Sequence, residues 1–504
     1  MQNFCGFTPA IDADATVYKS DTIITSELRD KLRAAATPLE DVLPVDQDWH
    51  PDSDEKVLDL VHPSLFPLLY GRSRVLKPEY GHVLNDNGEW NDKTGTVSLD
   101  DCELWIGKGG IMPVPEPAST QINSFPGRSE WRGHRDQHFY STRFQWLPCE
   151  VAFTDDHNRM KITSYINNLQ PGKYKDLYKV LEQVISRVVP MWNATLDSTE
   201  RERRDPRIDI NHIPWNVPEG APEHPAGGAT DESWDILEKW VDTHRTLVTP
   251  EPEPYSVRQK YTQPDHLRTK PVDLRKDFAD HGLQVIVKLA NIHLTPEKPE
   301  YGGGSWHIEG QLNEHICASA LYYYDSENIS DSYLSFRQAT DAEWLEQKPY
   351  EQNDHEHLSM LYGVESSSST AQELGSVLTR ENRVLTFPNV LQHRVSPFAL
   401  ADKTRPGHRK ILALFLVDPY TRIPSTANVP PQQKEWWREM VYKLDRIEKL
   451  PIELREWVMD SAGDFPIELE EAKRLRLELM EERKMFVEDH ETRLEDEYFS
   501  FCEH

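Results

Sequence analysis

A series of short apolar segments between residues 280 and 425 constrains the fold of this 504-residue chain more than any other feature. Leu283–Ile292 is a nearly continuous run of β-branched and other apolar residues. Three further segments have a similar apolar composition and are separated by turn residues: His315–Tyr324, Arg383–Phe387 and Arg409–Val417. Runs of this length and composition predict buried β-strands. A succession of such strands indicates an all-β sandwich or barrel in this part of the chain.

Helical patterns flank the strands. Lys173–Ile185 spaces its apolar residues three and four apart, which is typical of an amphipathic helix. Further helices are expected over Glu232–Thr243, over Glu435–Asp460 and from Glu468 to about Tyr498. The last of these is highly charged and has only a thin apolar stripe. It therefore either packs on the barrel or pairs with a second subunit, which would make a homodimer through the C-terminal helices.

Four regions differ in composition, and we expect them to form one integrated domain. They are a mixed α/β region at 1–150, a helical region with proline-rich loops at 151–275, a β core at 280–425 and a helical region at 430–504. In the first region, Val57–Tyr70 is apolar and interrupted by prolines, which indicates a short buried helix.

Three other segments give weaker signals. Aromatic and β-branched residues over Phe139–Phe153 indicate strands. Thr340–Ser369 is polar and is expected to form loops, so its cluster His355–His357 is interpreted as solvated rather than metal-binding. His134 and His138 have the i, i+4 spacing of a zinc-binding helix, but the residues around them do not favour a helix.

Charge and cysteine content limit the function classes. The chain carries 56 Lys and Arg against 85 Asp and Glu, so its formal net charge is −29. Such a chain repels phosphate backbones, and it has no basic patch to offset that repulsion, so nucleic-acid binding is not expected. The five cysteines lack paired spacing, and neither a signal peptide nor a membrane-spanning segment is recognisable. We therefore expect a cytoplasmic protein without membrane partners, with a nuclear location as the alternative.

One histidine–carboxylate motif and one distant histidine predict a metal site. Gly302–Gly304 leads into His307 and Glu309, which are two residues apart. On a strand, residues i and i+2 project to the same side, so these two can provide adjacent ligands. His393 follows the strand Arg383–Phe387 and a Pro-Asn turn. Two imidazoles and one carboxylate are the ligand set of non-haem Fe(II) oxygenases, which leave three coordination positions open.

Neighbouring strands offer candidate contacts for a keto acid. Arg409 begins the last apolar strand, and a buried guanidinium there requires a carboxylate partner. The distal carboxylate of 2-oxoglutarate fits, because Arg grips carboxylates with two parallel hydrogen bonds. Arg405 is the alternative, although it lies beside a Pro-Gly turn. Lys288, Asn291 and the run Tyr322–Tyr324, of which Tyr322 is taken first, are further candidates for cosubstrate contacts.

These motifs resemble the double-stranded β-helix core of the Fe(II)/2-oxoglutarate-dependent oxygenase superfamily. The segment Leu283–Arg337 is more closely similar to a fungal family defined by a domain of unknown function, which carries the same Trp-His-x-Glu-Gly motif. The resemblance implies an α+β fold in which a double-stranded β-helix of jelly-roll or cupin type is surrounded by helices. It also implies that His307, Glu309 and His393 bind Fe(II) and that Arg409 holds 2-oxoglutarate.

Two departures from the superfamily pattern matter. The carboxylate is Glu309 rather than the commoner Asp, as in Jumonji demethylases. The Arg-x-Ser pattern of many relatives reads Arg409-Lys410-Ile411 here, so a hydroxyl partner for the keto acid must come from elsewhere.

The resemblance implies an enzyme that couples decarboxylation of 2-oxoglutarate, at the expense of dioxygen, to oxidation of a second substrate. We expect hydroxylation, desaturation or cyclisation of a small molecule such as an amino acid or secondary metabolite. A Jumonji-like protein demethylase or hydroxylase is the enzymatic alternative, favoured by Glu309 and the acidic composition. A non-catalytic β-barrel binding protein is the alternative from another class, and the intact set of site residues argues against it.

Overall fold

The chain divides into two compact units in the computed structural model, which describes residues 6–13, 15–76, 97–115, 140–156, 159–200, 210–250, 271–340, 342–351, 354–460, 465–496 and 498–500. The larger unit comprises Met1–Glu200, Lys270–Phe336 and Gly375–His490. The smaller unit comprises the remainder: Arg201–Thr269, Arg337–Leu374 and Glu491–His504. All the predicted site residues belong to the larger unit.

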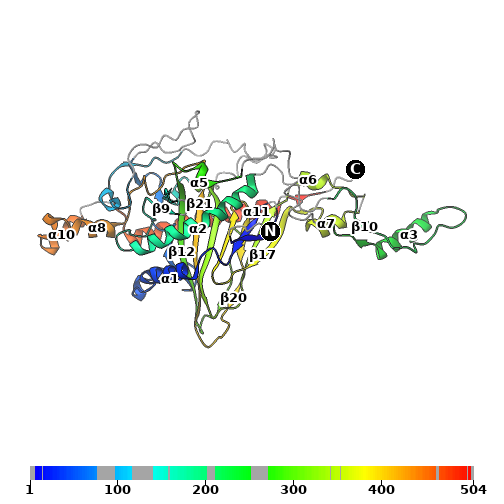
Figure 1. The fold of residues 1–504 in the computed structure, drawn as a ribbon, viewed down its shortest axis with the longest axis horizontal. Coiled ribbons are helices and arrows are strands. Elements are labelled where there is room, and N and C mark those ends of the chain that lie inside the picture. Colours follow the sequence, from blue (N-terminus) through cyan, green and yellow to red (C-terminus); the bar gives the residue numbers. More distant parts are fainter. Residues whose placement is uncertain are drawn as a thin grey trace. The chain divides into compact units, whose positions relative to one another are not determined.

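A nine-stranded antiparallel sheet forms the centre of the larger unit (Figure 1). Its order is β1-β2-β18-β14-β21-β12-β8-β9, and β3 also pairs with β12. Four of its strands confirm the apolar strands predicted from the sequence: β12 (Leu283–Leu294), β14 (Ile316–Glu327), β18 (Arg383–Pro388) and β21 (Gly407–Val417). The outer strands are β1 (Thr8–Ile11), β2 (Val17–Ser20), β3 (Val57–Val61), β8 (Cys149–Phe153) and β9 (Met160–Ile162).

The prediction of a short helix over Val57–Tyr70 is wrong. The segment forms β3, which pairs with β12, and then β4 (Leu68–Leu69), which pairs with β7 (Phe144–Gln145). Pairing with a strand more than 200 residues away supplies the packing that the local apolar spacing could not reveal. The strands expected after residue 139 are confirmed as β7 and β8.

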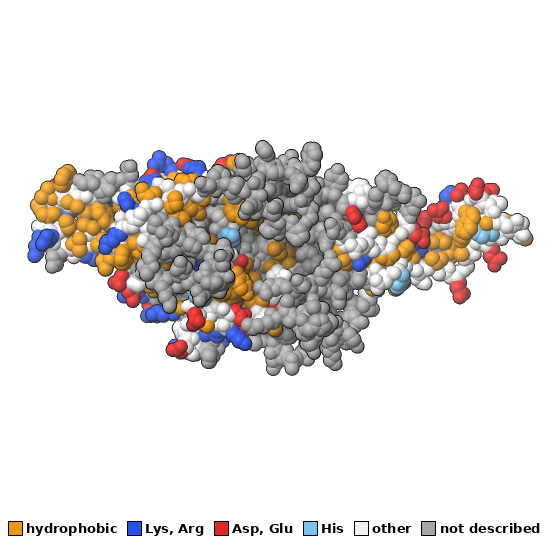
Figure 2. Space-filling model, turned by 90° about the horizontal axis from the view of Figure 1, so that it is seen from above, with side chains coloured by type: hydrophobic (Ala, Val, Ile, Leu, Met, Phe, Trp, Pro, Cys, Tyr) orange, Lys and Arg blue, Asp and Glu red, His pale blue; other side chains and the backbone are white. Residues whose placement is uncertain are grey.

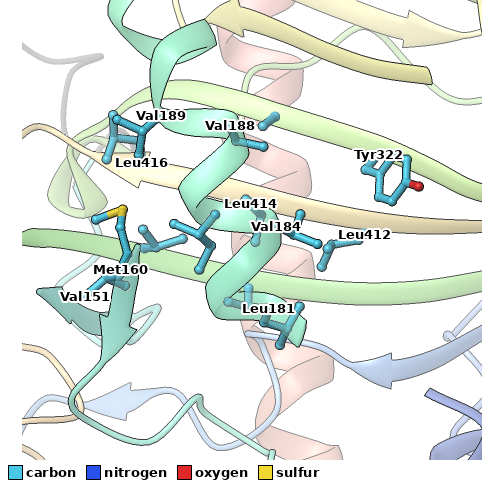
Figure 3. Close-up of a cluster of buried hydrophobic side chains, with 14 of the residues drawn as sticks. Val151, Met160, Leu181, Val184, Val188, Val189, Tyr322, Leu412, Leu414 and Leu416 are labelled. Atoms are coloured by element: carbon cyan, nitrogen blue, oxygen red, sulfur yellow. The ribbon is translucent and has the colours of Figure 1, made fainter. Parts of the chain in front are cut away.

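The two faces of the large sheet differ. Helices α1 (Ser26–Glu40) and α2 (Lys175–Glu200) pack on one face, and α2 confirms the predicted amphipathic helix. Alternate leucines of β21 contact this helical layer (Figure 3): Leu412, Leu414 and Leu416. Because side chains alternate along a strand, the residues between them project to the opposite side, which we call the inner face. The inner face includes Ile286, Lys288, Ala290 and Ile292 of β12 and Arg409, Ile411, Ala413 and Phe415 of β21.

Two small antiparallel sets of strands complete the β structure around the site. One pairs β13 (Glu300–Tyr301) with β20 (Phe398–Ala399). The other has the order β17-β15-β19, formed by Ala371–Leu378, Tyr333–Ala339 and Gln392–Val395 respectively. The described part of the chain is thus α+β with antiparallel sheets, as expected.

The C-terminal region is helical, as predicted. It contains α8 (Lys434–Tyr442), α9 (Asp445–Glu448), α10 (Ile452–Asp460) and α11 (Leu469–Asp496). Ala472 and Leu479 of α11 are buried, so the helix packs within the larger unit, whereas pairing with a second subunit stays a prediction. Apolar side chains are exposed on and beside α10, at one end of the view in Figure 2: Leu444, Ile452, Leu454 and Trp457.

The smaller unit contains α3 (Asp231–His244), which confirms the predicted helix, and the strand pair β10 (Trp215–Asn216) and β11 (Thr246–Leu247). The expectation of loops over Thr340–Ser369 is wrong in part, because this segment contains α6 (Ala342–Glu346) and α7 (Glu356–Tyr362).

The expectation that His355–His357 is solvated is also wrong for His357. Its side chain is buried, and its Nε2 lies 3.0 Å from the carbonyl oxygen of Pro349. Leu358 and Tyr362, four residues apart on α7, pack into an apolar cluster, and this packing buries the neighbouring histidine.

The remaining elements are short. They are the 3-10 helices at Pro44–Asp46, Cys102–Trp105 and Leu312–Glu314, helix α5 (Leu274–Asp277), and strands β5 (Arg74–Val75), β6 (Gly110–Ile111), β16 (Ser368–Ser369) and β22 (Tyr498–Phe499). Among the helices of the described ranges, none has the length and apolar character needed to cross a membrane.

Candidate metal centre

The structure brings His307, Glu309 and His393 together. The Nε2 atom of His393 lies 3.4 Å from Oε1 of Glu309, and that of His307 lies 3.9 Å from the same oxygen. The potential ligand atoms of all three residues lie within 4.8 Å of one another. Adjacent ligands of an octahedral ion with bonds of about 2.1 Å are about 3 Å apart. A small contraction would therefore turn this cluster into a metal-ligand set.

Backbone and side-chain hydrogen bonds fix the arrangement. His307 and His393 form an antiparallel bridge, with N–H to carbonyl distances of 3.1 and 2.9 Å. The side chain of Asn389 accepts a hydrogen bond from the Glu309 N–H at 2.9 Å and donates one to the Glu309 carbonyl at 2.8 Å. Asn389 thus clamps the carboxylate residue, a role that sequence reasoning did not assign to the Pro-Asn turn.

The glycine run before His307 is explained by close backbone approach. Gly303 has a φ of +85°, and a Cβ on it would lie 2.7 Å from the Val395 carbonyl oxygen. Only glycine fits this position without displacing the strand that carries His393.

Protonation states also suit metal binding. Burial, with the neighbouring His393, lowers the pKa of His307 to about 4. Burial raises the pKa of Glu309, but a hydrogen bond from His393 and the charges nearby outweigh it and lower that pKa to about 2. The Nδ1 of His307 is 2.8 Å from the Ser305 carbonyl oxygen, so it donates there and leaves Nε2 free as a ligand. At neutral pH the pair therefore offers a neutral imidazole and a carboxylate.

Arg409 is fully buried on the inner face without a carboxylate partner in the described part of the chain. Its Nη1 donates to the hydroxyls of Ser332 and Thr379 at 3.0 and 3.1 Å. Its guanidinium lies 4.2 Å from the ring centre of Phe398. Nε and Nη2 are buried and have no hydrogen-bond partner within the described ranges. Unused buried donors of this kind are suited to a carboxylate ligand.

The strands around Arg409 also lead to the metal ligands. Tyr301, whose pKa burial raises and the charge of Arg409 lowers, precedes His307 by six residues. Phe398, which contacts the guanidinium, follows His393 by five. The arginine and the cluster of histidines are thus held by the same two stretches of chain.

Lys288 lies on the inner face of the large sheet. It pairs in register with Ala413 and therefore sits on the inner face. Its positive charge contributes to the lowered pKa values of His307 and Glu309. Lys288 thus lies on the same face of the sheet as Arg409.

Arg405 and Tyr322 lie away from this centre. Arg405 is exposed and its Nε donates to the Asp402 carboxylate at 3.1 Å. Tyr322 points into the helix-covered core (Figure 3), where its hydroxyl donates to Asn382 at 2.8 Å. The next residue, Tyr323, faces Arg409 instead, with 5.6 Å from the guanidinium to the ring centre. The alternation along β14 was not used in the sequence prediction, and it distinguishes these two tyrosines.

A second cluster escaped the sequence analysis, because its segment was interpreted as a helix. The potential ligand atoms of His50, Asp59 and His62 also lie within 4.8 Å of one another. Here Asp59 bonds to Nδ1 of His50 at 2.8 Å, and a nitrogen of Arg476 is 3.8 Å from the same carboxylate. Glu309 forms no ion pair with a lysine or arginine among the described residues, so the first cluster is the better candidate for a metal-ligand set. His134 and His138 lie outside the described residues.

Fold and site define an antiparallel α+β protein with two imidazoles and one carboxylate gathered as a candidate metal-ligand set. The chain belongs to the family described as "Protein of unknown function (DUF4246)", whose model matches residues 1–440. No curated protein matches the sequence.

Several solved structures are similar at a low level. They include the Fe(II)/(alpha)ketoglutarate-dependent dioxygenase TqaL (14% identity, TM-score 0.18, covering 30% of this chain and 48% of that one). A bsmA homolog from Methylobium petroleophilum PM1 is 14% identical, with a TM-score of 0.17, and the match covers 38% of this chain and 54% of that one. IDO from Bacillus thuringiensis is 13% identical, with a TM-score of 0.16, and the match covers 28% of this chain and 52% of that one. Each match spans about half of the solved chain. Likenesses of this size carry no information on the fold or activity of this chain.

Proposed function

We propose that this protein is an Fe(II)- and 2-oxoglutarate-dependent oxygenase that hydroxylates, desaturates or cyclises a small molecule. One observation carries the proposal. His307, Glu309 and His393 converge in the same unit as Arg409, a buried cation with donors that no described residue uses. A metal ion and a carboxylate ligand would satisfy these two features together.

The order of the strands supports a double-stranded β-helix as the scaffold. β12, β14, β18 and β21 lie in the large sheet, whereas β13, β15, β17, β19 and β20 lie in the small ones. From β12 to β21, the chain therefore passes repeatedly between the large sheet and the small strand sets. Such alternation is typical of a jelly roll, in which two sheets face each other.

Different residues would bind the metal ion and the cosubstrate. His307, Glu309 and His393 would hold iron, which supplies one-electron and dioxygen chemistry when bound. Arg409 would hold the distal carboxylate of 2-oxoglutarate through Nε and Nη2, the donors that no described residue uses. The hydroxyls of Ser332 and Thr379, which already accept hydrogen bonds from Arg409, would supply the hydroxyl contact that the Arg409-Lys410-Ile411 sequence lacks.

The charges of the site favour a dicarboxylate. Fe(II) and the Glu309 carboxylate together carry one positive charge, and Arg409 carries another. A dianion such as 2-oxoglutarate would cancel both, which a buried site requires. The rings of Phe387 and Phe336 lie 4.8 and 6.3 Å from that of His393, so the ligands have an apolar surround that limits access of water.

The test is an anaerobic titration of the metal-free protein with Fe(II) and 2-oxoglutarate, read by the visible charge-transfer band of the iron–keto acid complex. We expect the band in the native protein and its loss in His307→Ala. Arg409→Met should raise the apparent Kd for 2-oxoglutarate at least tenfold, since hydrogen bonds to charged groups contribute about 1.5–3 kcal/mol.

Arg405→Met is the matched control, because Arg405 is exposed and already paired with Asp402. It should change the Kd by less than about twofold. Iron binding without the band would contradict the proposal and indicate another kind of iron protein. Absence of both iron and keto acid binding would favour a non-catalytic binding protein.

A further inference from the structure

An arginine of the C-terminal helix α11 is connected by hydrogen bonds to the turn that follows Glu309. Nη2 of Arg483 donates to Oε1 of Glu314 at 2.5 Å, and the Glu314 side chain is fully buried. The other oxygen of this carboxylate, Oε2, accepts a hydrogen bond from the backbone N–H of Gln311. Gln311 is two residues after the candidate ligand Glu309, so Glu314 connects the helix with the backbone beside that ligand.

The backbone between Glu309 and Gln311 lies directly against the Glu314 carboxylate. Gly310 has a φ of +71°, and a Cβ on it would lie 3.1 Å from Oε2 of Glu314. Oε1 of Glu314 also accepts a hydrogen bond from the Trp146 N–H at 2.8 Å. Donors from three segments of the chain therefore fix the carboxylate, and the carboxylate in turn fixes this backbone turn.

The same side of α11 also contacts the stretch that carries His393. Nε2 of Gln392, the residue before His393, lies 2.6 Å from Nδ1 of His490. An amide nitrogen only donates, so the imidazole nitrogen accepts this hydrogen bond. His490 follows Arg483 by seven residues, which is about two helical turns, so the two side chains project from one side of the helix.

Apolar residues already dock this side of the helix. Leu479 and Phe486 lie on it, and both are buried. A buried ion pair costs desolvation free energy, and it is often no more stabilising than apolar residues of similar volume. The hydrogen bonds of Arg483 and Glu314 have a fixed direction, which apolar contacts lack, and this property suits groups that hold a backbone turn in place.

We propose that α11 positions two of the three candidate metal ligands. One connection runs from Arg483 to the turn after Glu309, and the other runs from His490 to the stretch before His393. Arg483 and His490 are positioning residues in this proposal, since neither is itself a ligand of the metal ion. The proposal rests on the proposed function, because it concerns the same metal centre.

The first readout is the Kd of the metal-free full chain for Mn(II), measured by isothermal titration calorimetry. Arg483→Met should raise this Kd at least tenfold, because losing a group that orients a metal ligand typically weakens metal binding about 10- to 100-fold. Arg483→Lys keeps a charged donor for Glu314 and should bind Mn(II) more tightly than Arg483→Met. His490→Phe, which removes the acceptor for Gln392, should raise the Kd by about two- to tenfold.

Leu479→Ala is the matched control for loss of stability. Leu479 lies on the same side of α11, one turn before Arg483, and its truncation removes buried methyl groups but neither of the two connections. The Tm should fall, whereas the Kd for Mn(II) should stay within about twofold of the native value. If Leu479→Ala weakens Mn(II) binding as much as Arg483→Met does, the effect is a general loss of stability and the proposal is wrong.

The second readout is hydrogen exchange of backbone amides in the metal-free protein, which does not depend on metal binding. Arg483→Met should speed exchange of the Gln311 N–H more than Leu479→Ala does, because Glu314 loses the partner that fixes it. Unchanged exchange at Gln311, or an unchanged Kd for Mn(II), would overturn the positioning role and leave the metal centre standing. Absence of Mn(II) binding in the native protein would instead refute the metal centre on which the proposal rests.

Discussion

His307 and Glu309 hold the protonation states that a metal ion needs because of where they are buried. An imidazole in water has a pKa near 6.5, whereas burial lowers that of His307 to about 4. Glu309 shifts in the same direction, to about 2, since His393 and His307 stabilise its carboxylate. At neutral pH these two residues are therefore in the protonation states that bind a cation. The same pKa shifts make the stability of the folded protein depend on pH.

The metal-free protein should lose stability as the pH falls from about 6.5 to 4. Over this window, the unfolded chain protonates His307 while the folded protein does not, so acid favours unfolding. The loss due to His307 should be on the order of 2 kcal/mol, after allowance for its partial exposure. Urea unfolding at a series of pH values, in native protein and in His307→Gln, measures it.

The variant should show a flatter pH dependence than the native protein. His212→Gln, at an exposed histidine of the smaller unit, should leave the native slope unchanged. Equal slopes in His307→Gln and native protein would show that His307 is not held neutral by the fold. The contribution of Glu309 is lost only at lower pH, as the pH falls from about 4.5 toward 2.

For single residues, the sequence predicted which chemical groups form the candidate site but not which residues hold them in position. The His-x-Glu spacing and the distant His393 predicted residues that the structure brings together. The hydrogen bonds of Asn389 to Glu309 and the pairing of β3 with β12 join segments about 80 or more residues apart, which spacing in the sequence does not reveal. Tyr322 was chosen from a run of three tyrosines without knowledge of which face each would occupy.

At the scale of elements, the strongest local patterns predicted the structure best. The four central strands have long apolar sequences, and each pairs with a strand on both sides, so they are buried: β12, β14, β18 and β21. β3 was missed because it is an outer strand with a charged residue in its centre, and its identity depends on β12. Helix α11 was predicted, but its buried side contains arginines that bond to carboxylates of other segments.

Packing of the few apolar residues of α11 should make a measurable contribution to stability. Leu479 is fully buried, whereas Leu477, two residues earlier, is half exposed. Leu479→Ala should lower the free energy of unfolding by about 2–4 kcal/mol, because it removes buried methyl groups and leaves a cavity. Leu477→Ala should lower it by less than about 0.5 kcal/mol. Equal losses in denaturant titrations of the two variants would contradict packing of α11 on the larger unit.

For the whole molecule, net charge and local charge have opposite signs. The chain carries a formal charge of −29, yet the inner face of the large sheet gathers the cations Lys288 and Arg409, and α11 adds Arg476 and Arg483. Arg476 and Arg483 have carboxylate partners, whereas Arg409 has none among the residues that the structure describes. We therefore expect Arg409 to be the binding group for the carboxylate of the cosubstrate.

The most direct test of the central claim is a crystal structure of the full chain with Mn(II), which replaces iron without turnover, and 2-oxoglutarate. We expect an anomalous peak from a metal ion bound by His307, Glu309 and His393, with the distal carboxylate of 2-oxoglutarate on Arg409. A metal ion at His50, Asp59 and His62 instead, or 2-oxoglutarate bound away from Arg409, would contradict it.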